Sequence, residues 1–363
     1  MKLKVNTETL KQMVTKASKA SINNKMIPLT GLMGIELSNG KLNITTSDAV
    51  NFFTITENDI TGDNFKVVVQ TDLFSKLVSK TTSETVTLDY TNDVLTFTGN
   101  GTYTIELPLN EEGLPITYPT PTIPVDNVKT GTIKLATIKS AILANKPALA
   151  TTLEAPYLTG YYCNVDNIIS ADSFNICINK ATTFPADVLI SSIVFDLLSI
   201  SDVEDINYEF TDTVIVFTTP KMKLVSKNMV GKEDYPVTAV IGYLDEEFPS
   251  KCTLPKTTLL NVLDRLSLFI SSFDVNGVFL NFTSEGVKVT STKGNASEII
   301  PYQGSENFAP ITYLVTVDTL KKQVAARTGE LVNICYGIPK VLKLVDNNVT
   351  QIVACLDEED MEE

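Results

Sequence analysis

Histidine and tryptophan are absent from the 363 residues of the sequence. Without histidine the chain cannot build a Ser-His-Asp or Cys-His nucleophile, and it lacks the commonest metal ligand and proton shuttle. An enzyme would have to work with carboxylates, lysine, tyrosine or cysteine alone. No P-loop, nucleophile elbow or G-x-G-x-x-G fingerprint occurs either. The sequence therefore predicts a protein that is not an enzyme and that has no cofactor and no metal site.

Long apolar runs are also missing. None approaches the roughly 18 residues that a membrane span needs, and residues 1–5 alternate polar and apolar side chains instead of forming the apolar region of a signal peptide. The five cysteines are widely spaced and form no C-x-x-C pair. Most sit in apolar or alternating runs, which favours buried free thiols and a reducing compartment. We therefore expect a cytoplasmic protein without membrane contact.

Two breaks divide the chain into segments of similar length. Four prolines fall within residues 114–129, and a weaker break runs from Gly242 through an acidic triplet to Pro255. The breaks predict domains at residues 1–125, 126–246 and 247–363. Three segments of nearly equal length indicate a threefold internal repeat.

The hydrophobic patterns agree with a repeat. Each segment opens with a short strand and a helix-period stretch, continues with an alternating hairpin, and then has a second helix and further strands. The predicted helices are residues 7–20, 72–81, 136–149, 192–202, 256–270, and one beginning at Asp318. The fold class is therefore α+β, with three repeated domains that each pack two helices on antiparallel sheets.

Charge is unevenly distributed between helices and the rest of the chain. The six predicted helices carry a net charge of +6, whereas the whole chain carries −14, so the remainder carries −20. Such segregation would let an acidic protein hold DNA against its helices and repel it elsewhere. The alternative is that lysine, which favours helices, merely decorates solvated faces. The acidic runs at 245–247 and 357–363 lack the ligand spacing of a calcium loop and are expected to be a solvated linker and tail.

Several motifs resemble one known family, the bacterial DNA polymerase III β subunits, also called β sliding clamps. In the first segment these are residues 1–5 (MKLKV), 27–32 (IPLTGL) and the hairpin 34–48 that ends in Ser47-Asp48. The middle segment repeats the theme at 156–160 (PYLTG) and 170–174 (SADSF). Residues 223–226 (KLVS) and 233–236 (EDYP) are similar to the run that leads into the family's third domain. The resemblance spans essentially the whole chain.

The resemblance implies a DNA sliding clamp, which is a processivity factor without enzymatic activity. Two subunits would join head to tail in a six-domain ring, with helices lining the hole and sheets outside. Duplex DNA would pass through the hole without sequence preference, a clamp loader would open the ring, and the replicative polymerase would dock by a short linear peptide. The absence of histidine and the divergent motifs are typical of a phage-encoded or otherwise remote member. The alternative is a structural or virion protein of repeated α+β domains with no DNA role.

Three groups of residues are expected to carry these functions. Basic side chains should be exposed and face DNA: Lys11, Lys16, Lys19, Lys25, Lys76, Lys80, Lys139, Lys146, Lys321, Lys322 and Arg327. By position in the family, the peptide pocket would comprise Leu158, Asp172, Phe174, Ile176, Tyr235, Thr238, Ile352, Ala354 and Leu356. The subunit interface would join the strand edge around Tyr103, Ile105 and Leu107 to the helix end at Leu266, Phe269 and Ile270.

Two departures from the family concern the pocket. Phe174-Asn175 stands where the family often carries His-Arg, and Ala354-Cys355-Leu356 runs into an acidic tail in place of a Met-Pro-Met-Arg-Leu type of ending. Phe174 could plug the groove, and the acidic tail could favour partners with basic flanks. The apolar pocket residues could also simply fill the seam between two domains and leave no opening.

Overall fold

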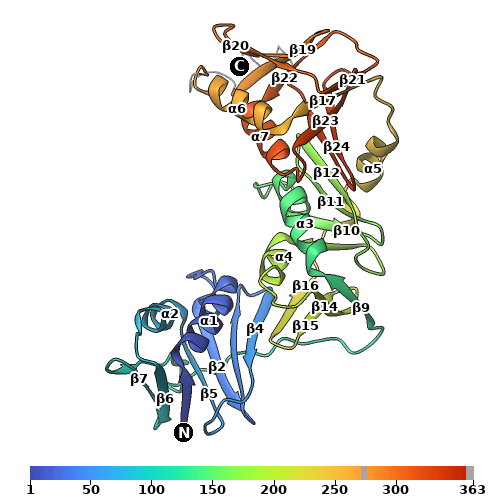
Figure 1. The fold of residues 1–363 in the computed structure, drawn as a ribbon. Helices are drawn as coiled ribbons and strands as arrows, with labels where there is room; N and C mark the ends of the chain where they lie inside the picture. The colour runs from blue at the N-terminus through green and yellow to red at the C-terminus, as the bar shows by residue number, and fades with distance from the viewer. Residues whose placement is uncertain (271–275, 357–363) are drawn as a thin grey trace. The chain divides into compact units, whose positions relative to one another are not determined.

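A computed structural model describes residues 1–270 and 276–356 of the chain (Figure 1). The chain divides into two compact units, one made of residues 1–138 and 193–228, the other of residues 139–192 and everything from 229 onward. Each unit is described separately. Both are built mainly of antiparallel sheets.

The first unit contains an eight-stranded sheet in which strands from distant parts of the sequence pair. The strand order is β5-β2-β3-β4-β16-β15-β14-β9. Strand β4 pairs with β16, with Asn51 opposite Ser226 and Ile55 opposite Met222. The strands are β2 (Leu32–Ser38), β3 (Lys41–Ser47), β4 (Asn51–Glu57), β5 (Phe65–Gln70), β9 (Lys129–Lys134), β14 (Asp205–Phe210), β15 (Val214–Thr219) and β16 (Met222–Lys227).

A second, four-stranded sheet of this unit has the order β1-β6-β7-β8. Its strands are β1 (Lys2–Asn6), β6 (Thr85–Thr91), β7 (Val94–Thr98) and β8 (Thr102–Ile105). Strand β1 alternates, with Leu3 and Val5 buried and its lysines exposed, as a sheet with one solvated face requires. Strand β8 is the last strand of the sheet.

Helices of the first unit pack against these sheets. Helix α1 contacts β3 and β4, α2 contacts β5, and the two helices pack on each other (Figure 1). Asn6 caps α1 by accepting hydrogen bonds from the backbone N–H groups of Glu8 and Thr9, and Leu10, Met13 and other apolar side chains face the core. The helical elements are α1 (Thr7–Ala17), η1 (Ser18–Ala20), η2 (Pro28–Gly31), α2 (Thr71–Lys80) and α4 (Ser192–Leu198).

The second unit contains a nine-stranded sheet in the order β13-β10-β11-β12-β25-β24-β23-β17-β21. Strand β12 pairs with β25, with Ile176 opposite Ile352. The strands are β10 (Gly160–Cys163), β11 (Asn167–Ala171), β12 (Asn175–Lys180), β13 (Val188–Ser191), β17 (Ser250–Pro255), β21 (Gly304–Glu306), β23 (Leu331–Tyr336), β24 (Val341–Asp346) and β25 (Val349–Ala354).

A four-stranded sheet, β20-β19-β18-β22, completes this unit, and α6 and α7 pack on each other beside it. Its core includes Phe282 stacked on Tyr336 at 4.0 Å between ring centroids. The strands are β18 (Gly277–Phe282), β19 (Gly286–Ser291), β20 (Ser297–Pro301) and β22 (Ile311–Thr316). The helical elements are η3 (Lys146–Ala148), η4 (Pro156–Thr159), η5 (Lys232–Asp234), α5 (Val237–Asp245), α6 (Lys256–Ser267) and α7 (Val317–Ala325), while α3 (Leu135–Asn145) runs from the first unit into the second.

Two turns show that the units share a repeated design. Asp48 accepts hydrogen bonds from the backbone N–H groups of Val50 and Asn51 just before β4. Asp172 does the same for Phe174 and Asn175 just before β12. In both turns the asparagine side chain also donates to the aspartate. Each turn therefore sets up the strand that pairs with a partner far along the sequence.

The predicted α+β class is confirmed, and so are most of the predicted helices. Helix α4 is shorter than predicted, since it ends at Leu198, and α5 lies at a place where the sequence reading puts a break. The boundaries at residues 125 and 246 stay a prediction. Each large sheet joins strands from two of the predicted domains, through the β4–β16 and β12–β25 pairings. The acidic run 357–363 lies outside the described residues.

Candidate nucleic-acid interface and peptide pocket

The lysines of the first unit that were predicted to face DNA lie on α1, η1, α2 and the loop that follows η1. Lys19, Lys25, Lys76 and Lys80 are exposed, and Lys11 and Lys16 are half-buried. Helix α1 buries its Leu10–Met13–Val14–Ala17 stripe. Its polar side, which carries Lys11 and Lys16, therefore faces solvent. This face can contact a polyanion without disturbing the core.

The second unit contributes four further lysines. Lys139 on α3, Lys146 at η3 and Lys322 on α7 are exposed, while Lys321 on α7 is half-buried. Helix α7 likewise directs Val317, Leu320 and Val324 into the core.

Arg327, just after α7, departs from this set. Its side chain is only 3% exposed, so the prediction that it is exposed is wrong. Its Nη1 and Nη2 donate to the carbonyl oxygens of Val349 and Leu344 at 3.1 and 2.8 Å. Burial lowers the pKa of the guanidinium from its usual value. Arg327 therefore ties the end of α7 to β24 and β25, and we leave it out of the candidate DNA-binding residues.

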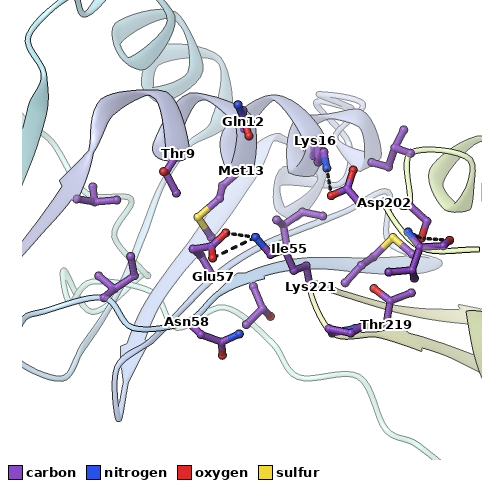
Figure 2. A pocket seen from close by; sticks show the side chains of 18 of the residues that line it. Thr9, Gln12, Met13, Lys16, Ile55, Glu57, Asn58, Asp202, Thr219 and Lys221 are labelled. Atoms are coloured by element: carbon purple, nitrogen blue, oxygen red, sulfur yellow. Dashed lines mark hydrogen bonds and ion pairs between the residues drawn. The ribbon is translucent and has the colours of Figure 1, made fainter.

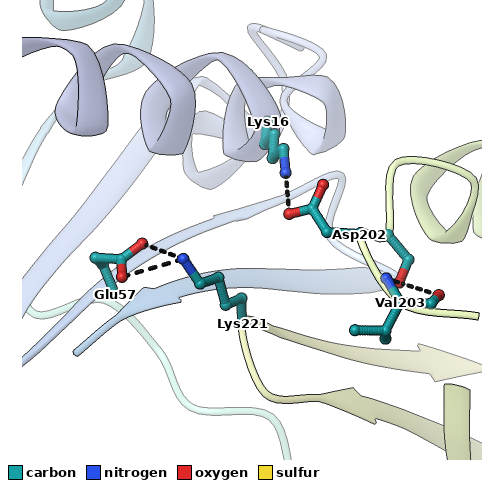
Figure 3. Close-up of polar contacts among 6 residues, drawn as sticks. Lys16, Glu57, Asp202, Val203 and Lys221 are labelled. Carbon is teal, nitrogen blue, oxygen red and sulfur yellow. Dashed lines mark hydrogen bonds and ion pairs between the residues drawn. The ribbon is translucent and has the colours of Figure 1, made fainter. Parts of the chain in front are cut away.

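Three of the candidate lysines are paired with aspartates. Lys16 Nζ lies 2.7 Å from Asp202 Oδ2 in the loop after α4 (Figure 3). Lys76 Nζ lies 2.7 Å from Asp72 Oδ2, one turn away on α2. Lys321 on α7 pairs with Asp264 on α6. These side chains are solvent-accessible, so each pair contributes at most about 1 kcal/mol to stability.

A cavity of about 560 Å³ opens beside α1 in the first unit (Figure 2). Its walls are α1, the end of β4, the start of β16 and the loop at residues 200–203. Met13, Ile55 and Met222 give it an apolar part, and the Lys16–Asp202 pair lies on its lining. A second ion pair, Lys221 to Glu57 at 2.9 Å, lines it as well. Local sequence patterns do not reveal this cavity, because some of its lining residues, such as Val5 and Met222, lie more than two hundred positions apart.

The predicted peptide pocket falls within the second unit, and the structure brings part of it together. Leu158, Ile176 and Tyr235 share one apolar cluster with Tyr162. Tyr235 is buried, and burial raises the pKa of its hydroxyl well above the usual value. Its ring lies 5.0 Å from that of Tyr162. These three residues of the predicted pocket therefore pack together, and their role in binding a peptide stays a prediction.

Ile352 and Ala354 of the predicted pocket lie on β25. Ile352 lies opposite Ile176 across the β12–β25 pairing, and the Ala354 N–H donates to the Phe174 carbonyl at 2.8 Å. Phe174 is 56% exposed, so its ring stands out from the surface beside this wall. Asp172 holds the turn before β12, and Thr238 is exposed on α5.

Leu356, the last of the predicted pocket residues, does not belong to the apolar cluster. It bridges to Leu314 and lines a separate cavity of about 280 Å³ with residues of β22 and the loop before β24. The structure therefore links Leu356 to β22, whereas Leu158, Ile176 and Tyr235 form a single cluster.

The predicted interface residues divide into exposed and buried ones. Tyr103 on β8 and Phe269 after α6 are exposed, and Leu107 and Ile270 are half-buried. Ile105 and Leu266 are buried within their own unit, Leu266 in the core beneath α6. Within this set, Tyr103 and Phe269 are the exposed side chains.

The cysteines carry no sign of reactivity or metal binding. All five are free, three are buried and two are half-buried, and burial raises the pKa of Cys177 and Cys252 to about 12. Over the described residues, no group of histidine, cysteine and carboxylate side chains is arranged to hold a metal ion. In the same part of the chain, no helix is long and apolar enough to cross a membrane.

Comparison with known proteins finds a family model that matches the start of the chain. Residues 1–118 match the sequence profile of the N-terminal domain of the DNA polymerase III beta subunit. The first third of the chain is therefore similar to that domain. The family resemblance seen in the sequence is confirmed. No functionally curated protein matches the sequence.

Solved structures of similar fold cover nearly the whole chain. The DNA polymerase sliding clamp of Bacillus subtilis is 19% identical, with a TM-score of 0.85 over 98% of this chain and 99% of that one. The DNA polymerase III beta chain of Streptococcus pneumoniae is 18% identical, with a TM-score of 0.86 and the same coverage. The DnaN sliding clamp of Bartonella birtlesii, solved bound to griselimycin, is 13% identical with a TM-score of 0.84 over 98% and 99%. The whole chain therefore has the bacterial sliding-clamp fold.

Proposed function

We propose that the protein is a DNA sliding clamp, a processivity factor that encircles duplex DNA and tethers a replicative polymerase. The observation that carries the proposal is the clamp fold over 98% of the chain, together with a family match at residues 1–118. The exposed lysines on η1, α2, α3 and α7 support it, because a clamp must meet the phosphate backbone with its helices. The protein would act by topology and tethering and would catalyse no reaction.

In this proposal two subunits form a closed ring of six domains, three from each chain, with boundaries near residues 125 and 246. The outer edge of β8 would meet the third domain of the partner subunit near Phe269. Such a head-to-tail contact closes when the rotation is twofold. The end position of β8 in its sheet and the exposure of Tyr103 and Phe269 support this arrangement.

The polymerase and the clamp loader would dock through short linear peptides on the second unit. The apolar wall of Leu158, Ile176 and Tyr235, with exposed Phe174 beside it, supports a site for a large apolar side chain of the peptide. The alternative, in which these residues only fill the seam, predicts that no peptide binds.

Threading of the protein onto the free ends of linear DNA tests the ring proposal without a clamp loader. A long linear duplex carries biotin at both ends, and the protein is added either before or after streptavidin blocks the ends. A ring threads onto free ends and is trapped by later blocking, so it should resist a high-salt wash only when it is added first.

Two results would contradict the proposal. Equal retention in both orders indicates ordinary DNA binding along the duplex. If the protein is retained in neither order, it has no DNA role, as the structural-protein alternative requires.

A further inference from the structure

In the part of the chain that the structure describes, at least three of the ten candidate DNA-facing lysines already hold a carboxylate. The pairs are Lys16–Asp202, Lys76–Asp72 and Lys321–Asp264. They arise in different ways, since one joins α1 to the loop after α4, one lies within α2, and one joins α7 to α6. The same pairing on four helices and a loop is not explained by the packing of any single element.

The three aspartates are accessible to water and to a ligand. Their side chains are 64%, 69% and 58% exposed for Asp202, Asp72 and Asp264. Exposed ion pairs contribute little to folding, so the fold does not depend on them. A phosphate group can therefore reach each ammonium group, but it must displace the aspartate or accept its repulsion.

This competition changes the thermodynamics of DNA binding. A lysine that contacts phosphate normally displaces a condensed cation, and this release makes the affinity fall steeply with salt. When the lysine must first leave an aspartate, part of the electrostatic gain is lost. The nearby carboxylate also repels the phosphate that replaces it. Each paired lysine thus contributes less affinity and a smaller salt dependence than an unpaired one.

We infer that Asp72, Asp202 and Asp264 compete with DNA phosphates for Lys76, Lys16 and Lys321, and thereby keep the DNA-facing surface weakly binding. The inference rests on the proposed clamp function and deepens it. A clamp needs to stay on DNA by topology and to move along it freely, so tight phosphate contacts would hinder it. The aspartates supply an internal counter-charge that limits such contacts.

The test removes the three carboxylates and keeps the side-chain shapes. A triple variant, D72N/D202N/D264N, is compared with a control, E36Q/D89N/D205N. The control carboxylates also sit in ion pairs, with Lys66, Lys2 and Lys134, but these lysines lie on strands outside the candidate set. Both variants change the net charge by the same amount.

Binding to a short linear duplex with free ends is measured by fluorescence anisotropy over a salt series. The triple variant should bind at least about threefold tighter at low salt. The slope of log affinity against log salt should steepen by up to about 2.7, because each freed lysine adds about 0.9. The control should stay near the wild type. Thermal unfolding of both variants is recorded, since a merely structural role would lower Tm and leave the slope unchanged.

The outcomes distinguish a failure of the aspartate competition from a failure of the clamp function. Equal steepening in both variants means that net charge alone matters and overturns the inference. An unchanged slope in the triple variant overturns it as well. In either case, end-dependent trapping of the wild type would leave the clamp function standing. Loss of trapping in the wild type would remove the clamp function and the inference together.

Discussion

Arg327 Nη2 donates a hydrogen bond to the carbonyl oxygen of Leu344 at 2.8 Å inside the second unit. An arginine so placed acts through its donors to the backbone and has no free charge to offer DNA. Its position next to α7, which carries Lys321 and Lys322, made it look like part of the same basic face. Burial gives it a different role.

Arg327→Met should therefore lower stability and leave DNA binding unchanged. The carbonyl groups of Leu344 and Val349 would lose buried donors, at a cost of about 1–3 kcal/mol. Chemical denaturation measures this loss. The control is Lys322→Met on the exposed face of α7, which should leave stability unchanged and reduce the DNA salt slope by about 1. A reversed pattern would return Arg327 to the DNA-binding set.

The peptide pocket predicts a selective loss of partner binding. Leu158→Asp and Ile176→Asp should each weaken binding of a polymerase C-terminal peptide at least about tenfold, because a charge on the apolar wall would lose its hydration when an apolar anchor covers it. Leu153→Asp, at an exposed position outside the cluster, is the control. Calorimetric titration reports the affinities. Equal binding by the wild type and both pocket variants would rule the pocket out.

The subunit interface predicts a change of oligomeric state. Tyr103→Ala with Phe269→Ala should yield monomers, since truncating a buried aromatic side chain costs about 3 kcal/mol and each 1.4 kcal/mol weakens association about tenfold. Val125→Ala, which alters an exposed side chain elsewhere, should have no effect. Sedimentation velocity distinguishes these cases. A dimer that persists in the double variant would refute this placement of the interface.

The two equivalent turns predict equal costs but unequal functional effects. Asp48→Ala and Asp172→Ala each remove a carboxylate that accepts two backbone hydrogen bonds. Each should destabilise the protein by about 1.5–3 kcal/mol. Only Asp172→Ala should weaken peptide binding, since Asp172 holds Phe174 in place beside the pocket. If both variants weaken the peptide equally, the effect comes from general loosening of the fold.

Buried thiols predict a loss of stability in alkali. Burial raises the pKa of Cys177 from 9.0 to about 12, so between these values the unfolded chain has lost a proton that the folded chain keeps. The free energy of unfolding should therefore fall as pH rises above about 9, by up to about 1.4 kcal/mol per pH unit for this thiol. Cys177→Ala should flatten the slope between about pH 9 and 11. A slope equal to that of the wild type would show that Cys177 does not contribute.

The sequence predicts the repeat and most helices because their apolar periodicity is strong. In α1, the stripe from Leu10 to Ala17 is the one the pattern predicts. Helix α5 was missed although Val237, Val240, Ile241 and Leu244 follow helical spacing. The acidic triplet and the neighbouring prolines favoured a linker at this point, so the local signal for a break outweighed the periodicity.

The features that could not be predicted depend on contacts between distant residues. Lys16 meets Asp202 only because strands β4 and β16 pair and bring the loop after α4 to α1. Likewise, nothing in the local sequence of Arg327 indicates that β24 and β25 will cover it. Charge counts along helices therefore find basic faces, but they do not reveal which charges are already paired or buried.

The pairing of β12 with β25 also has a consequence for biosynthesis. Residues 175–179 pair with residues 349–353. During translation the edge of β12 therefore stays unpaired until some 170 further residues have been made. An open strand edge is a site for wrong pairing with another chain, and contacts this far apart in sequence form slowly. Nascent chains that stop short of β25 should therefore be the species that chaperones hold and that aggregates recruit. Once β25 pairs with β12, this edge is no longer open to wrong pairing.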